Sequence, residues 1–431
     1  MPDSQPRQPD DHPADAADGP GSDPATGTGT LVLCGARLTD GRVVDVRLGG
    51  SRIEAVGTAG SLTSPGPRLD LRGYLLLPAP AEPHAHSDTA LTAAGAGPGG
   101  PGPVSHRPED IRRRATEAAL LQLGHGATAL RSHVRIGDVR GLTAFEAVLQ
   151  ARRSLRGLAD LTAVAVPRLL TGVAGADNLA LLHDAVKMGA GAVGGCPDLD
   201  PDPAGYTEAV LEIAAEQGCP VDLHTDGDDP ARLCRLAAMA GGLRPGVSIG
   251  PCAGISRLPA HAAARVADQL AAAGVTVVCL PQGGCCGVEG PGTAPVRLLR
   301  AAGVRVAAGG GALRDVANPV GRGDPLEAAY LLASQYGLRA GEAYGAVSSV
   351  ARKAMGLPEV RVEAGFPAEL LAVRGEELSG VLSLAYSRIV VHRGRVVART
   401  SAVREYCDSE AVVALDLPRQ GRSDPGPCGG P

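Results

Sequence analysis

The chain has 431 residues, of which 44% are hydrophobic and 2% aromatic, and its net charge is -5. Such a chain can bury a core that is almost entirely aliphatic. Without a basic cluster or aromatic stacking platforms, it does not fit a nucleic-acid-binding protein. No apolar run reaches the roughly 18 residues of a membrane span, and the acidic N-terminus does not resemble a signal peptide. We therefore expect a soluble, cytoplasmic protein.

The two ends of the chain differ in composition from the middle. Residues 1–29 are dominated by Pro, Asp, Gly, Ser and Ala and are predicted to be disordered. Residues 401–431 are predicted to form an extension that ends in a loose tail. Short strand-like runs separated by turn signals occupy 30–74, and a similar pattern returns over 360–400. We predict that these two distant segments build one small β-sandwich.

The middle segment, 75–359, alternates short apolar runs with amphipathic stretches rich in Ala and Leu. This alternation is typical of parallel strands connected by helices. It predicts a (β/α)8 TIM barrel, in which active sites lie at the C-terminal ends of the strands. The expected strands lie at about 75–81, 128–134, 161–166, 191–195, 220–224, 247–250, 275–280 and 303–308.

Two histidines spaced one residue apart, His84 and His86, end the first apolar run of the middle segment. Residues i and i+2 of a strand face the same side, so both imidazoles can bind one ion. His224 ends a later expected strand and is followed by Asp226, which could orient it. We expect His84, His86 and His224 to be metal ligands. The alternative is that these histidines pack the barrel mouth without any ion.

These motifs resemble the amidohydrolase superfamily, and within it the bacterial cytosine deaminases. The resemblance covers about residues 30–400 and implies a TIM barrel with a terminal sandwich. It also implies one zinc or iron ion, held by the histidine pair, a histidine ending strand 5 and an aspartate ending strand 8. The implied reaction displaces ammonia from a ring carbon. The resemblance rests on Glu82-Pro-His84-Ala-His86-Ser-Asp88, Arg131-Ser-His133-Val134, Asp222-Leu-His224-Thr-Asp226 and the spacing of Gly309, Asp315, Pro319 and Gly321.

Several groups that the resemblance implies are replaced in this chain. The proton-shuttling glutamate aligns with Gly227, the strand-6 histidine with Pro251 and the strand-8 aspartate with Gly311. The glutamine that reads a pyrimidine edge aligns with Arg168, and a tryptophan over the pocket aligns with Ala317. Loss of the general acid and base alone costs on the order of 10²–10⁴-fold in rate. Ordinary cytosine deamination is therefore not expected.

Four polar side chains near strand ends are further candidates. Arg168 and His133 are expected to contact substrate, and a guanidinium at position 168 would suit a carboxylate-bearing compound. Asp226 and Asp315 are candidates for a substitute acid or ligand. The alternatives are a structural role for His133 and solvated loop positions for the two carboxylates.

Two weaker patterns have ordinary structural explanations. The backbone amides of Gly309–Gly311 could hold a phosphate, but a glycine-rich turn is the preferred interpretation. Cys196 and Cys252 follow strands and could supply a thiolate that would favour zinc. Reduced, buried thiols are the preferred interpretation of these and the other eight cysteines.

Three hypotheses about function follow. The first is a divergent metal-dependent hydrolase of non-peptide carbon–nitrogen bonds, with a non-standard fourth ligand. The second is a catalytically inactive pseudoenzyme, and the third is a metal-free binder of a small anion. All three predict a small-molecule substrate or ligand rather than a nucleic acid or a membrane, and all are compatible with a homo-oligomer.

Overall fold

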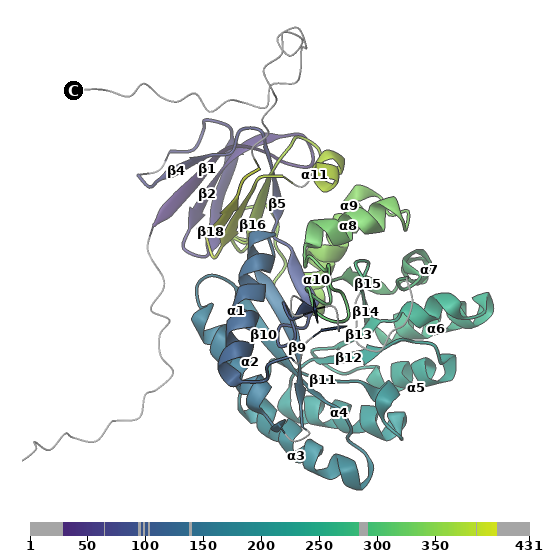
Figure 1. The fold of residues 1–431 in the computed structure, drawn as a ribbon. Coiled ribbons are helices and arrows are strands. Elements are labelled where there is room, and N and C mark those ends of the chain that lie inside the picture. The colour runs from purple at the N-terminus through teal and green to yellow at the C-terminus, as the bar shows by residue number, and fades with distance from the viewer. Residues whose placement is uncertain are drawn as a thin grey trace, which may run out of the picture. The chain divides into compact units, whose positions relative to one another are not determined.

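The computed structural model describes residues 29–402 except 64, 94–95, 98–99, 102–103, 138–139, 284–291 and 385. The tail expected at 1–29 and the extension at 401–431 lie almost entirely outside the described residues. In the described part, eight parallel strands form one sheet with helices along its outside (Figure 1). A second sheet collects strands from both ends of the chain. The expected (β/α)8 barrel with a terminal β-module is confirmed.

The barrel strands are neighbours in space in the same order as in sequence. They are almost continuously buried, as expected for parallel strands covered by helices. All eight overlap an expected strand, although β6 does so only at Ala81. The strands are β6 (Ala81–Ala85), β9 (Ala129–Ile136), β10 (Asp160–Pro167), β11 (Ala192–Gly195), β12 (Val221–Thr225), β13 (Val247–Pro251), β14 (Thr276–Cys279) and β15 (Arg305–Ala308).

The helices of the barrel alternate with these strands. Three of them begin at an aspartate whose carboxylate caps the first turn, followed by a proline at the first helical position. The helices are α1 (Pro108–Gly124), α2 (Thr143–Ser154), α3 (Gly172–Lys187), α4 (Pro203–Gln217), α5 (Pro230–Ala240), α6 (Ala260–Ala273), α7 (Val296–Ala301), α8 (Pro325–Ser334), α9 (Ala340–Val347) and α10 (Ser349–Ala354), with short 3-10 turns η3 (Pro197–Leu199) and η4 (Ala253–Arg257). The two-residue strands β7 (Ala96–Gly97) and β8 (Gly100–Pro101) pair with each other.

The barrel closes between its first strand and the glycines after its last. The amide of Gly311 donates to the carbonyl of His84 at 3.0 Å. The buried carboxylate of Glu82 accepts from the amides of His84 at 3.0 Å and Gly310 at 2.8 Å. A Cβ on Gly309 would lie 2.5 Å from a carboxylate oxygen of Glu82. The close approach of the Glu82 carboxylate leaves no room for a side chain at Gly309 and little at Gly310.

The second sheet has the strand order β18-β17-β16-β5-β1-β2-β3, with β4 paired to β1. A single residue pair, Arg37 with Leu75, joins its two halves. Residues of both halves, including Val46 and Val391, share one hydrophobic core, as in a sandwich. The strands are β1 (Thr30–Arg37), β2 (Val43–Gly49), β3 (Arg52–Thr58), β4 (Arg68–Asp70), β5 (Tyr74–Pro78), β16 (Leu370–Arg374), β17 (Arg388–His392) and β18 (Arg395–Thr400), with α11 (Leu378–Leu384) between β16 and β17.

The strand expected at about 75–81 is wrong in one respect, because the structure divides it. Tyr74–Pro78 pairs with Leu370–Arg374 in the terminal sheet, and the barrel begins only at Ala81. Pro78 and Pro80 lack the N–H group that would continue a ladder, which accounts for the break. The apolar pattern on both sides of the prolines is the same, so periodicity alone did not show it.

One buried ion pair connects the terminal sheet to the barrel, and a second buried contact lies within the sheet. The guanidinium of Arg388 on β17 makes two bonds, of 2.8 and 2.6 Å, to the carboxylate of Asp324, which caps α8. Nδ1 of His392 lies 2.9 Å from Oε2 of Glu369. Among the described helices, none is long and apolar enough to cross a membrane.

Candidate active site

Four histidine side chains meet inside the C-terminal end of the barrel. His84 lies on β6, His133 on β9 and His224 on β12, and His86 directly follows β6. Their ring centroids lie between 4.2 and 5.7 Å apart. Parallel strands end at the same edge, so histidines that are far apart in sequence converge here.

Three of these histidines form a group of the size that a metal ion requires. One ring nitrogen each from His84, His86 and His224 lies within 4.8 Å of the others. Burial lowers the pKa of all three, that of His86 to about 3, so the imidazoles are neutral at pH 7. Nε2 of His86 is buried without a hydrogen-bond partner among the described residues. Neutral imidazoles with an unused nitrogen suit zinc or iron, so these residues fit the implied ion.

His133 lies beside a buried ion pair that crosses the barrel. Its Nε2 lies 3.4 Å from Oδ2 of Asp222 on β12, and Nη1 of Arg131 donates to the same oxygen at 2.8 Å. Arg131 also donates to the carbonyl of Ala354 at 2.8 Å. Burial opposes the charge of Asp222, but His133 and Arg131 together lower the pKa of that carboxyl. Both ring nitrogens of His133 are buried, and neither makes a hydrogen bond to a described residue.

Asp226 lies beyond His224, but its carboxylate is engaged elsewhere. It accepts a hydrogen bond from the amide of Gly254 at 3.0 Å and forms an ion pair with Arg257. Both partners belong to η4, which follows β13. The carboxylate therefore ties two neighbouring loops together at the barrel mouth.

Asp315 is likewise occupied by structural hydrogen bonds. It accepts from the hydroxyl of Thr89 at 2.9 Å and from the amides of Ala317 at 2.8 Å and Asn318 at 3.2 Å. Its side chain is buried. These bonds fix the loop after β15 against the loop after β6.

Two arginines stand at the rim without such partners. Arg168 follows β10 directly and is exposed, and its side chain makes no hydrogen bond or ion pair with a described residue. The same is true of Arg135 near the end of β9, which the sequence reasoning missed. Arg135 lies two residues after His133, so strand alternation was the signal that could have found it.

The glycine amides do not form a phosphate cradle. Gly309 donates to the carbonyl of Cys279 at 3.0 Å, and Gly310 and Gly311 donate to Glu82 and His84 as described above. All three amides are therefore used within the protein, and the glycine-rich turn is the interpretation that the structure supports.

Comparison with known proteins gives the family. A model described as "Amidohydrolase family" matches residues 105–398. The chain belongs to the amidohydrolase family. Family membership accounts for the barrel and for a histidine-lined mouth, since such hydrolases usually bind a metal at the C-terminal strand ends.

Similar proteins cover most of the chain. It is 26% identical over 403 residues to a pterin deaminase of Rhizobium rhizogenes, covering 86% of this chain and 90% of that protein. The crystal structure of N-isopropylammelide isopropylaminohydrolase from Burkholderia multivorans matches with a TM-score of 0.74 and 26% identity, covering 87% of this chain and 100% of that one. The 5-methylcytosine deaminase of Klebsiella pneumoniae has a TM-score of 0.75 at 22% identity, again covering 87% and 100%, and shows the shared fold.

Three positions at which the family resemblance implies catalytic side chains hold glycine or proline in this chain. Gly227 has a φ of +77°, and a Cβ there would lie 3.0 Å from Ile255. Gly311 has a φ of +67° and pairs with Ala85 at the seam of the barrel. Pro251 ends β13. At these three positions the described backbone presents no side chain that can move a proton.

The two candidate thiols do not join the histidine cluster. Burial raises the pKa of Cys196 to about 11 and that of Cys252 well above its ordinary value. Neither thiol belongs to a metal-sized group in the described part of the chain. Protonated, buried thiols fit the structural interpretation.

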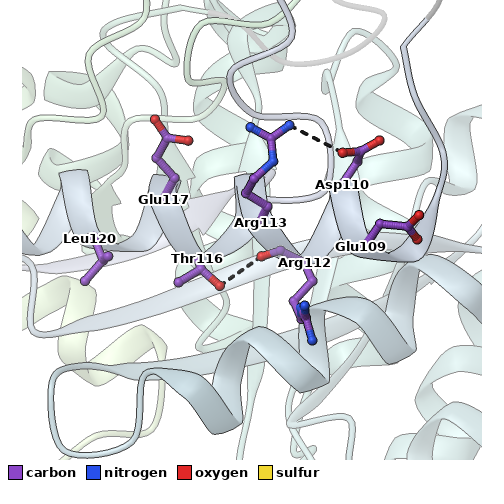
Figure 2. A pocket seen from close by; sticks show the side chains of 7 residues that line it. All are labelled: Glu109, Asp110, Arg112, Arg113, Thr116, Glu117 and Leu120. Carbon is purple, nitrogen blue, oxygen red and sulfur yellow. Dashed lines mark hydrogen bonds and ion pairs between the residues drawn. The ribbon is translucent and has the colours of Figure 1, made fainter.

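Two surface hollows in the described part of the chain lie away from the histidines. One, of about 530 Å³, is a shallow depression on the exposed face of α1 (Figure 2), where Arg113 already pairs with Asp110. The other, of about 370 Å³, lies at the N-terminal ends of β13 and β14, opposite the barrel mouth. None of the candidate site residues lines either hollow.

Proposed function

We propose that this chain is a divergent metal-dependent amidohydrolase that cleaves a non-peptide carbon–nitrogen bond in a small molecule. The observation that carries the proposal is the convergence of His84, His86 and His224 at the barrel mouth, with ligand nitrogens within 4.8 Å of one another. The similar proteins support it, because their names describe a deaminase and hydrolases that act on amino groups.

The proposed ligands hold one zinc or iron ion. When bound, such an ion would make water nucleophilic near neutral pH and polarise the bond that is attacked. Burial keeps the imidazoles unprotonated, so metal binding does not compete with protons at pH 7.

His133 is our proposal for the fourth ligand. The aspartate that the resemblance implies is replaced by Gly311, whose amide closes the barrel. Nε2 of His133 lies 3.4 Å from Oδ2 of Asp222, and neither ring nitrogen of His133 makes a hydrogen bond to a described residue. A carboxylate behind a ligating histidine fixes its tautomer and orientation.

The same geometry argues against ordinary cytosine deamination. Gly227 and Pro251 offer no proton-transferring side chain, and the carboxylates of Asp226 and Asp315 are engaged with neighbouring loops. This observation favours a second candidate, a catalytically inactive member of the family that retains ligand binding.

A screen for released ammonia or amine tests the proposal. Zinc- or iron-loaded protein is incubated with a panel of amides and amino-heterocycles, with His86→Gln as the matched control. We expect at least one compound to be hydrolysed by the native chain alone. Metal-loaded native protein that releases nothing from any compound would instead favour the inactive binder.

The role of His133 is tested separately by metal titration. His133→Ala should weaken zinc binding about 10–100-fold, in the range measured for groups around metal sites. An unchanged zinc affinity would remove His133 from the ligand set.

A further inference from the structure

The inner side of β9 carries three cationic or titratable side chains in a row. Arg131, His133 and Arg135 alternate along the strand, so all three face the same side. Arg131 reaches Asp222 on β12, and the ring of His133 lies 4.5 Å from that of His224. Both contacts cross the barrel interior. Arg135 therefore faces the interior as well, one step nearer the mouth.

The two inward arginines of β9 differ in their partners. Arg131 is almost fully buried and donates to Asp222 and to the carbonyl of Ala354. Arg135 is exposed, and its guanidinium makes no hydrogen bond or ion pair with any residue in the described part of the chain.

Arg168 adds a second cation on the neighbouring strand. In the β9–β10 ladder His133 pairs with Val164 and Arg135 pairs with Val166, and both valines belong to the interior cluster. Arg168 follows β10 directly at the same rim. Arg135, which pairs with Val166, and Arg168, which lies two residues beyond Val166, are thus both exposed at this end of the two neighbouring strands.

Two carboxylates of the mouth are paired with arginines other than Arg135 and Arg168. Asp226 pairs with Arg257, and Asp198 pairs with Arg232 at 3.0 Å and accepts from Thr225 at 2.9 Å.

Two more carboxylates face the same region. The bonds of Asp315 to its own loop and to Thr89 are given above. Asp88 lies near enough for Arg135 to favour its charged form, but the two side chains make no ion pair.

We propose that Arg135 and Arg168 bind the carboxylate group of a small-molecule ligand at the barrel mouth. A guanidinium presents paired N–H donors that match a carboxylate, and a fixed cation without a protein partner is a natural site for one. The inference rests on the proposed function only in taking the mouth as the position of the substrate. It narrows the substrate class to acidic compounds, in which the scissile group reaches the histidines while the carboxylate stays at the rim.

Binding of malonate to metal-free protein tests this site. The protein is dialysed against a chelator, so that an anion cannot bind through a metal, and malonate and inorganic phosphate are titrated by calorimetry. The variants are Arg135→Gln and Arg168→Gln, with Arg153→Gln on the exposed face of α2 as the control for charge alone. Circular dichroism checks that each variant is folded.

We expect native protein and Arg153→Gln to bind malonate equally, and Arg135→Gln to bind it about tenfold or more weakly. Arg168→Gln should also bind malonate more weakly than the native protein. Native protein that binds no malonate at millimolar concentration overturns the inference, as does unchanged binding by Arg135→Gln. Phosphate bound in preference to malonate also overturns it, because the rim would then suit a tetrahedral anion.

Paired substrates separate this inference from the proposed function. Amino-heterocycles with and without a carboxylate are compared for release of ammonia by the metal-loaded native chain. If neither is hydrolysed while malonate binding depends on Arg135, the proposed function fails and the rim site stands. If both are hydrolysed equally well and malonate does not bind, the hydrolase stands and the rim site fails.

Discussion

Buried histidines occur in two regions of this molecule and are treated differently in each. In the terminal sheet, His392 is fully buried; its Nδ1 lies 2.9 Å from the carboxylate of Glu369, and its Nε2 has no hydrogen-bond partner among the described residues. In the barrel mouth, both ring nitrogens of His133 and both of His224 are buried without such a partner. A buried polar atom without a partner costs about 1–3 kcal/mol.

We interpret the terminal-sheet histidine as structural and the mouth histidines as functional. His392, Glu369 and the Arg388–Asp324 pair connect the terminal sheet to itself and to the barrel. The mouth instead gathers ring nitrogens of His86, His133 and His224 that make no hydrogen bond to a described residue, and a bound ion or ligand would satisfy them. Unmet bonding capacity is therefore concentrated where the family places its metal.

The largest loss of stability is expected from a substitution in the buried ion pair between the terminal sheet and the barrel. Arg388→Met leaves the buried carboxylate of Asp324 without its cation and should cost about 3–5 kcal/mol of unfolding free energy. Urea denaturation measures it. Metal affinity of the folded protein should stay at the native value, since Arg388 lies outside the mouth. A loss below 1 kcal/mol would show that the pair does not secure the terminal sheet.

Acid should destabilise the metal-free protein because the buried mouth histidine His86 resists protonation in the folded state. The unfolded chain protonates His86 near 6.5, whereas burial lowers its pKa to about 3 in the folded state. Between these values the unfolded state binds more protons, so stability falls as pH falls. One such histidine contributes at most about 2 kcal/mol between pH 6.5 and 5. Denaturation at several pH values should show a shallower slope for His86→Gln; an identical slope would contradict the account.

A matched pair of substitutions contrasts the two kinds of histidine directly. His392→Gln disrupts a buried pair with Glu369 and should cost about 1–3 kcal/mol. His86→Gln removes a ring with an unsatisfied nitrogen and should cost less than about 1 kcal/mol in metal-free protein, at pH 7.5. Thermal or urea unfolding measures the loss of stability in each variant, and the two losses are then compared. The reverse order would mean that the mouth histidines hold the fold.

Much of the barrel followed from sequence because its strands are apolar runs with turn signals on both sides. The run at 75–81 was divided between two sheets, since the prolines at 78 and 80 interrupt pairing without changing the hydrophobic pattern. The histidine pair was visible because strand geometry relates positions two apart.

Other parts of the site depend on contacts that no local pattern encodes. Arg131 meets Asp222 across 91 positions of sequence, and that pair decides how His133 is held. The engagement of Asp226 by Arg257 could not be read from an acidic loop. Arg135 was within reach of the sequence, but only once His133 was known to face the interior.

The most direct test of the account is the metal content of purified protein. Native chain and His86→Gln are loaded with zinc or iron, dialysed and measured by elemental analysis. The account predicts about one ion per chain in native protein and a clear loss in the variant. Native protein that retains no metal after reconstitution, or a variant that retains as much as the native chain, would contradict the proposal that the histidines form a metal site.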